Sequence, residues 1–194
     1  MNRFLRVVLF VVMGTMLGAA GGLVLPSVRT QDTGLGLAGI LRLGAFGALV
    51  ASAGSIVERN LKKLLTAWII GAATFILLVL GILGLSHVAL GLLPSVLAII
   101  VAAALFPAVV AFADCLVDEL YRAILYETFF SAIGGMAGLV FAWAWHWTRG
   151  SFSPFQMIVP AAIYSAVIWL GMGLAKRIEE SEETLEAREE SGPS

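Results

Sequence analysis

The residue types best suited to chemistry gather between positions 114 and 127. This stretch contains Asp114, Asp118, Glu119, Arg122 and Glu127. Asp114 and Asp118 are four residues apart, so on a helix both carboxylates face one way and could share a divalent cation. Asp118 and Arg122 are also four apart and can pair with each other. Metal binding or catalysis, docking of a partner and a plain hydrated helix are the three alternatives for this cluster.

The sequence lacks the other parts that catalysis at such a cluster would need. A family of membrane transferases that act on nucleotide-linked alcohols uses a DxxxD pair, but it also needs an earlier D-x-x-D-G-x-x-A-R half, which is missing here. The GxSxG, P-loop and HExxH motifs are absent, and the single cysteine, Cys115, excludes an internal disulfide and a CxxC site. We therefore expect a hydrated helix, no metal ligands, no cofactor and no enzymatic activity.

Glu127 differs from the other four residues because it begins an apolar stretch. An ionisable group inside a membrane is usually functional, because a buried charge is costly. This glutamate lies so close to the expected interface that we predict a position among the headgroups, beside Arg122 or Lys176.

The elements that carry these residues must be membrane helices. Apolar residues make up 60% of the 194 and charged residues 13%, with a mean hydropathy of +0.97. A soluble domain has roughly 25% charged residues, whereas a bilayer solvates apolar surface directly. The net charge of −1 excludes a basic field for nucleic acid. The lipid bilayer is therefore the first partner that the sequence predicts.

Six spans fit the gaps between charges, because a helix needs about 20 apolar residues to cross a bilayer. We predict spans at about 7–28, 38–57, 128–147 and 155–175, with two more in the uncharged stretch 64–113, broken near Ser86-His87 and Pro94-Ser95. Pro107 and Pro160 should kink the fourth and sixth spans. The predicted fold is an all-α, polytopic membrane bundle over residues 1–178. Residues 179–194 form an acidic tail, helical and then disordered.

Lysine and arginine predict the orientation, because they are enriched in cytoplasmic loops. With the N-terminus inside, nine of the 12 face the cytoplasm: Arg3, Arg6, Arg59, Lys62, Lys63, Arg122, Lys176, Arg177 and Arg188. Arg29, Arg42 and Arg149 face outside. Both termini should therefore be cytoplasmic, in a plasma membrane or a bacterial inner membrane.

Glycines form the clearest pattern within the spans. One group comprises Gly14, Gly18, Gly21 and Gly22, and a second comprises Gly134, Gly135 and Gly138. Glycine lets helix backbones approach closely in lipid. We expect packing within the chain first, with contact to another subunit or a backbone-lined site as alternatives. A shift of 117 residues superposes Gly18 on Gly135 and Arg59 on Lys176, which suggests a parallel repeat of spans one and two in spans five and six.

Six short spans in a chain of this length resemble, in size and topology alone, the substrate-binding components of energy-coupling-factor vitamin transporters. No binding motif of that family is matched, so no residue roles carry over. Two hypotheses remain. The first is a non-catalytic bundle that forms a homo-oligomer or serves as a subunit of a larger membrane complex. The second is a small transporter or channel component for an apolar or neutral solute.

Overall fold

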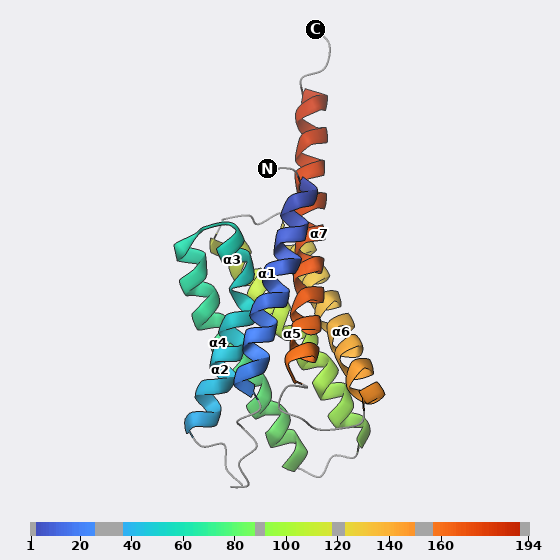
Figure 1. Cartoon of the computed structure of the whole chain (residues 1–194). Coiled ribbons are helices and arrows are strands. Elements are labelled where there is room, and N and C mark those ends of the chain that lie inside the picture. Colours follow the sequence, from blue (N-terminus) through green and yellow to red (C-terminus); the bar gives the residue numbers. More distant parts are fainter. Residues whose placement is uncertain (1–2, 26–36, 88–91, 118–122, 150–156, 191–194) are drawn as a thin grey trace.

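The computed structural model describes residues 3–25, 37–87, 92–117, 123–149 and 157–190 (Figure 1). This part of the chain is all-helical and contains no strand, which confirms the predicted class. Its seven helices are α1 (Arg3–Val24), α2 (Leu37–Ala51), α3 (Ala53–Val57), α4 (Leu61–His87), α5 (Leu92–Val117), α6 (Ile124–Arg149) and α7 (Ile158–Glu190).

Five of these helices are long and apolar enough to cross a membrane. The crossing segments are Phe4–Val24, Leu61–Gly84, Val96–Val117, Ile124–Trp145 and Ile158–Glu179. The prediction of a membrane bundle is confirmed at this level, and the count of six spans is not. The span expected at 38–57 consists of two shorter helices, α2 and α3, which meet at Ser52.

The break at Ser52 has a local and a distant cause. The Ser52 hydroxyl donates to the Ala48 carbonyl at 2.5 Å, and the Ser52 amide bonds Leu49 instead of Ala48. Back-bonding of this kind tends to bend a helix. The indole N–H of Trp169, which comes from α7, donates to the Val50 carbonyl at 2.8 Å. The bend is therefore tied to a contact between helices distant in sequence.

A tight turn joins α3 to α4 and fixes the side chains at its two ends. Arg59 adopts a positive φ of 54°. Its N–H bonds the Ile56 carbonyl, and the N–H of Asn60 bonds the Ser55 carbonyl, which is the Schellman pattern that ends many helices. The Asn60 side-chain oxygen then accepts the amides of Lys62 and Lys63 and caps α4. Glu58 and Lys63 are thereby held at the same end of the bundle.

The helices form a closed ring in chain order. α1 packs against α2 and α3, then α2 and α3 contact α4, α4 contacts α5, α5 contacts α6, and α6 contacts α7. α7 closes the ring with an extensive contact along α1, and the two helices lie side by side in Figure 1. The buried centre of the ring contains Phe10, Val50, Phe106, Trp169 and Met172.

The two helix-breaking prolines occupy different positions. Pro107 lies inside α5, as predicted. Pro160 was expected to kink the sixth span, but α7 begins at Ile158 and the proline falls in its first turn. A first-turn residue has no intrahelical partner for its N–H, so proline costs little there. α7 continues past Lys176 through the acidic residues to Glu190 and extends beyond the ring (Figure 1).

Candidate functional site: an ion network and an apolar cavity

Glu58, which follows the last residue of α3, is the centre of a buried cluster of charges. Its carboxylate accepts hydrogen bonds from Arg6 of α1 at 3.1 Å, from Lys63 of α4, and from Lys176 of α7 at 2.5 Å. Asp114 of α5 completes the cluster, at 3.4 Å from the Lys176 ammonium and 3.7 Å from that of Lys63. We call Arg6, Glu58, Lys63, Asp114 and Lys176 the ion network.

The ion network is buried enough for its pairing to matter. The Lys63 side chain is 3% exposed, and those of Lys176, Glu58 and Asp114 are 9–11% exposed. A charge removed from water is tolerated only when it is paired and hydrogen-bonded. Five helical elements are therefore tied together at the end of the bundle from which α7 extends.

The pKa of Glu58 shows which effect dominates at the network. Burial by itself raises this pKa, because it disfavours the charged form. The charge and hydrogen bond of Lys176, joined by those of Lys63, outweigh burial and lower the pKa from 4.5 to about 2. Glu58 is thus a carboxylate at every ordinary pH.

Glu127 is buried inside the bundle. It is 2% exposed, in the first turn of α6, and its position among the headgroups stays a prediction. Its carboxylate accepts a hydrogen bond from the Cys115 thiol of α5 at 3.4 Å, and it interacts electrostatically with Lys176 and Asp114. Close packing of α6 against α5 and α7 draws the side chain inward.

The structure describes only two of the five residues of the polar cluster predicted between positions 114 and 127. The structure brings Asp114 and Glu127 to one end of the ring, whereas Asp118, Glu119 and Arg122 lie outside the described residues. Among the residues described, no three His, Cys, Asp or Glu side chains gather closely enough to hold a metal ion. The sequence reading missed Glu58 as a site residue and treated Lys63 and Lys176 as topology markers only. Glu58 and Lys176 are 118 residues apart, and no local pattern connects them.

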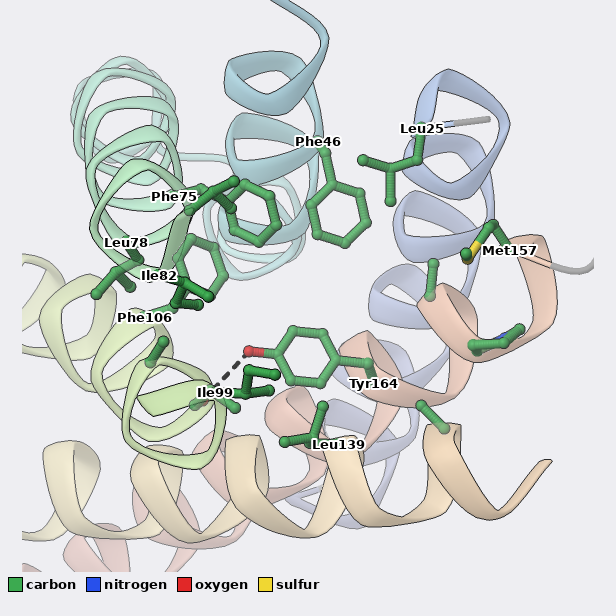
Figure 2. Close-up of a pocket in the computed structure, with 16 residues that line it drawn as sticks. Leu25, Phe46, Phe75, Leu78, Ile82, Ile99, Phe106, Leu139, Met157 and Tyr164 are labelled. Atoms are coloured by element: carbon green, nitrogen blue, oxygen red, sulfur yellow. Dashed lines mark hydrogen bonds between the residues drawn. The ribbon is translucent and has the colours of Figure 1, made fainter. Parts of the chain in front are cut away.

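A cavity of about 280 Å³ occupies the other half of the ring. Helices α2, α4, α5, α6 and α7 contribute to its wall, together with Leu25, which follows the last residue of α1 (Figure 2). The wall is almost entirely apolar, and four of its side chains are aromatic: Phe46, Phe75, Phe106 and Tyr164. The Phe75 ring lies 4.7 Å from that of Phe46 and 5.4 Å from that of Phe106, measured between centroids, so three helices meet through these rings.

The cavity wall contains one polar pair, the Tyr164 hydroxyl and the Ala103 carbonyl, and Pro107 explains why they meet. Proline has no N–H, so the carbonyl of Ala103, four residues earlier, loses its helical donor. The Tyr164 hydroxyl of α7 donates to this carbonyl at 3.2 Å (Figure 2). Gly135 of α6 packs against the same carbonyl so closely that a Cβ would collide with it. The cavity therefore has one hydroxyl and one carbonyl in an otherwise apolar wall.

Trp169 lies on α7 between Tyr164, which lines the cavity, and Lys176, which belongs to the ion network. Its indole stacks on Phe10, with 5.7 Å between ring centroids and 4° between planes. Gly14 and Gly54 leave room for the indole, because a Cβ at either position would lie 2.6 Å from it. The buried indole therefore separates the cavity from the ion network along the ring axis.

The seven predicted packing glycines all lie against helices of the same chain. Gly14, Gly18 and Gly22 of α1 face α7, and Gly21 faces Phe46 of α2. Gly134 and Gly138 of α6 face α7, and Gly135 faces α5. At Gly18 a Cβ would lie 2.5 Å from the Ala161 carbonyl oxygen and 2.6 Å from the Ser165 Cβ.

Comparison with known proteins adds no family to this picture. No family model matches the chain, and no curated protein or solved structure is significantly similar to it, so the resemblance in size to vitamin-transporter components has no match to support it.

Proposed function

We propose that this protein binds a small, neutral, apolar molecule within the membrane and belongs to the class of small transporter or channel components. The observation that carries this proposal is the cavity inside the helix ring, lined by five helices and Leu25 and almost free of polar groups. Ligand sites in helical bundles commonly lie between the helices. The ion network then holds the opposite half of the ring together.

The size and lining of the cavity define the class of ligand. Its 280 Å³ is roughly twice the ~150 Å³ of an apolar protein cavity that admits benzene. A charged solute would lose its hydration and find only the Tyr164 hydroxyl and the Ala103 carbonyl in return. The proposed ligand is therefore a compact hydrocarbon or aromatic molecule with at most one polar group.

The proposal includes six crossings with both termini in the cytoplasm. With Ser52 between them, the 15 residues of α2 and five of α3 reach the length of about 20 that a crossing needs. The asymmetry of lysine and arginine supports the orientation. In this arrangement the ion network is at the cytoplasmic end, and the cavity is in the outer half. The parallel repeat of the first and last hairpins stays a prediction.

Side-specific labelling tests this topology. Single cysteines introduced at Asn60 and Ser151, in a Cys115→Ala background, should react from the inside and the outside respectively. Labelling of both positions from the same side would contradict the six-crossing arrangement.

Binding is tested with a neutral fluorescent naphthalene derivative and the purified chain in mild detergent. We expect saturable fluorescence enhancement with the wild type. Ala142→Phe places a ring in the cavity wall and should weaken the apparent affinity at least about tenfold. Ala144→Phe is the matched control, since Ala144 is exposed on the same helix, and it should bind like the wild type. Non-saturable binding, or equal loss in both variants, would contradict the proposal.

Assembly as a homo-oligomer or as a subunit of a larger complex is the second candidate, and α4 favours it. This helix is the least buried of the five long spans, and Gly81 and Gly84 have open space around them. Glycines with open space permit close approach of another membrane helix. A single cysteine at position 81, in the Cys115→Ala background, should form a disulfide-linked dimer in native membranes. Its absence under oxidation would remove the support for self-association through α4.

A further inference from the structure

Glu127 is the buried acid that the ion network does not pair. Among the described residues, no cationic nitrogen lies within ion-pair distance of its carboxylate, and its one hydrogen-bond donor is the Cys115 thiol. A thiol is a weak donor. A carboxylate that is 2% exposed and has no counter-ion among the described residues pays a large desolvation cost, which a bound proton removes.

A second polar group next to Glu127 is also left without a partner. Ser131 lies one helical turn further along α6, on the same face. Its hydroxyl is fully buried and makes no hydrogen bond in the described structure. Gly135 lies one further turn along the same face of α6 and packs on the Ala103 carbonyl at the cavity wall. Glu127 and Ser131 thus form the start of a polar line from the network towards the cavity.

Among the described cations, Lys176 is the one that interacts with Glu127. It already bonds Glu58 and lies 3.4 Å from Asp114, and it interacts electrostatically with Glu127. The other groups that face Glu127 are Cys115 and Asp114 of α5 and Glu179 of α7. The neighbouring acids Asp114 and Glu179 repel a negative charge at Glu127, and a shift of Lys176 towards it would stabilise one.

We propose that Glu127 is a proton-binding site, and that release of its proton draws Lys176 away from Glu58 and Asp114 and loosens the ion network. In this step the carboxylic acid gives its proton to a water molecule and becomes a carboxylate. The Lys176 ammonium then turns towards Glu127. This inference rests on the proposed function and deepens it, because it supplies the ion whose binding would be coupled to movement of the apolar ligand.

Infrared spectroscopy tests the protonation itself. The purified wild type at about pH 7 should show the C=O stretching band of a protonated carboxylic acid. Glu127→Gln keeps the shape of the side chain and should remove that band. Glu186→Gln, a change in the acidic turns of α7, should keep it. The proposal is overturned if the band is absent from the wild type or persists in Glu127→Gln.

Cys115 reports the loosening, since it is the single cysteine and is buried beside Glu127. We measure its reaction with a small neutral thiol reagent at about pH 6 and about pH 8.5, dividing each rate by that of the denatured protein to remove the intrinsic titration of the thiol. The normalised rate should rise about tenfold in the wild type and in Glu186→Gln, because the network opens. It should stay low in Glu127→Gln. A rate independent of pH in the wild type, or the same rise in Glu127→Gln, would refute the coupling.

Binding of the naphthalene probe separates this inference from the proposed function. Glu127→Gln should bind the probe in the cavity like the wild type at about pH 6, because the amide resembles the protonated acid. Probe binding together with an absent acid band would refute the proton site and leave the cavity function standing. An acid band without saturable probe binding would refute the cavity function alone.

Discussion

The two halves of the helix ring solve opposite packing problems. At the end around Glu58, side chains of opposite charge from five helical elements lie in contact, and the pocket beside Lys63 and Asp114 measures only about 10 Å³. At the end around Tyr164, aromatic and aliphatic side chains from five helices and Leu25 leave about 280 Å³ unfilled. Trp169, bonded to the Val50 carbonyl, lies between them.

The difference predicts that the two halves respond differently to substitution. Buried ion pairs demand precise geometry, because a displaced partner leaves an unpaired charge in a low dielectric. Apolar side chains make weak, non-directional contacts and can rearrange around a guest at small cost. We therefore expect changes at the network to affect the stability of the whole ring, and changes at the cavity to affect binding more than folding.

The largest effect should come from Glu58→Gln. This change leaves Lys63 and Lys176 without the carboxylate that both contact, and breaking a buried pair costs about 3–5 kcal/mol. Thermal melting in mild detergent would measure the loss, with Glu186→Gln as a control that should melt like the wild type. A melting temperature of Glu58→Gln equal to that of the control would break the comparison, because the network would then add no stability.

The dependence of folding stability on acidic pH provides a second test of the ion network. The pKa of Glu58 is about 2 in the folded protein and is ordinarily 4.5, so its stabilising effect is fully present above pH 4.5 and is lost as the pH falls towards about 2. The stability difference between the wild type and Glu58→Gln should therefore shrink over that range. Unfolding measured at a series of pH values would show this, and a difference that stays constant would contradict it.

Gly18→Leu should cost less than loss of Glu58. A side chain at this position collides with the Ala161 carbonyl and Ser165 on α7, and overpacking typically costs about 1–3 kcal/mol. Gly81→Leu is the matched control, because nothing lies within 4 Å of a Cβ there. Equal melting of the two variants would show that α1 and α7 can separate without cost at the cavity end.

Tyr164→Phe removes the donor that the Ala103 carbonyl acquires in place of the Pro107 amide. An unsatisfied buried carbonyl costs about 1–3 kcal/mol, so a modest drop in melting temperature is expected. Tyr126→Phe, at a half-exposed position outside the cavity wall, should leave the melt unchanged. If Tyr164→Phe melts like this control, the polar pair in the cavity wall has no structural role.

Arg59→Gly should change the melting temperature least of these substitutions, and it should raise the melting temperature rather than lower it. Arg59 holds a left-handed backbone, with φ of 54°, which costs an L-residue about 1–2 kcal/mol relative to glycine. Arg59→Ala retains this strain and removes the side chain. Arg59→Gly should therefore melt higher than Arg59→Ala, and the reverse order would mean that the turn before α4 is not strained.

The long helices can be predicted from the sequence, because a single long apolar segment in lipid satisfies its backbone hydrogen bonds only as a helix. The sequence predicts a break near Ser86-His87 and Pro94-Ser95; α4 ends at His87, but α5 already begins at Leu92 and includes Pro94 and Ser95. The bend at Ser52 was not predicted. It depends on a serine back-bond and on the Trp169 indole from the other end of the chain, and neither is visible in the local pattern.

The sequence by itself determined that the chain is apolar, helical and nearly uncharged within its spans. Only the tertiary structure decided that Glu58 meets Lys176, that Glu127 is buried, and that the half of the ring around Tyr164 is unfilled. The physical reason is that apolar periodicity acts on each helix separately. Ion pairs and cavities depend on which helices become neighbours when α7 closes the ring against α1, and on whether their side chains fill the space between them.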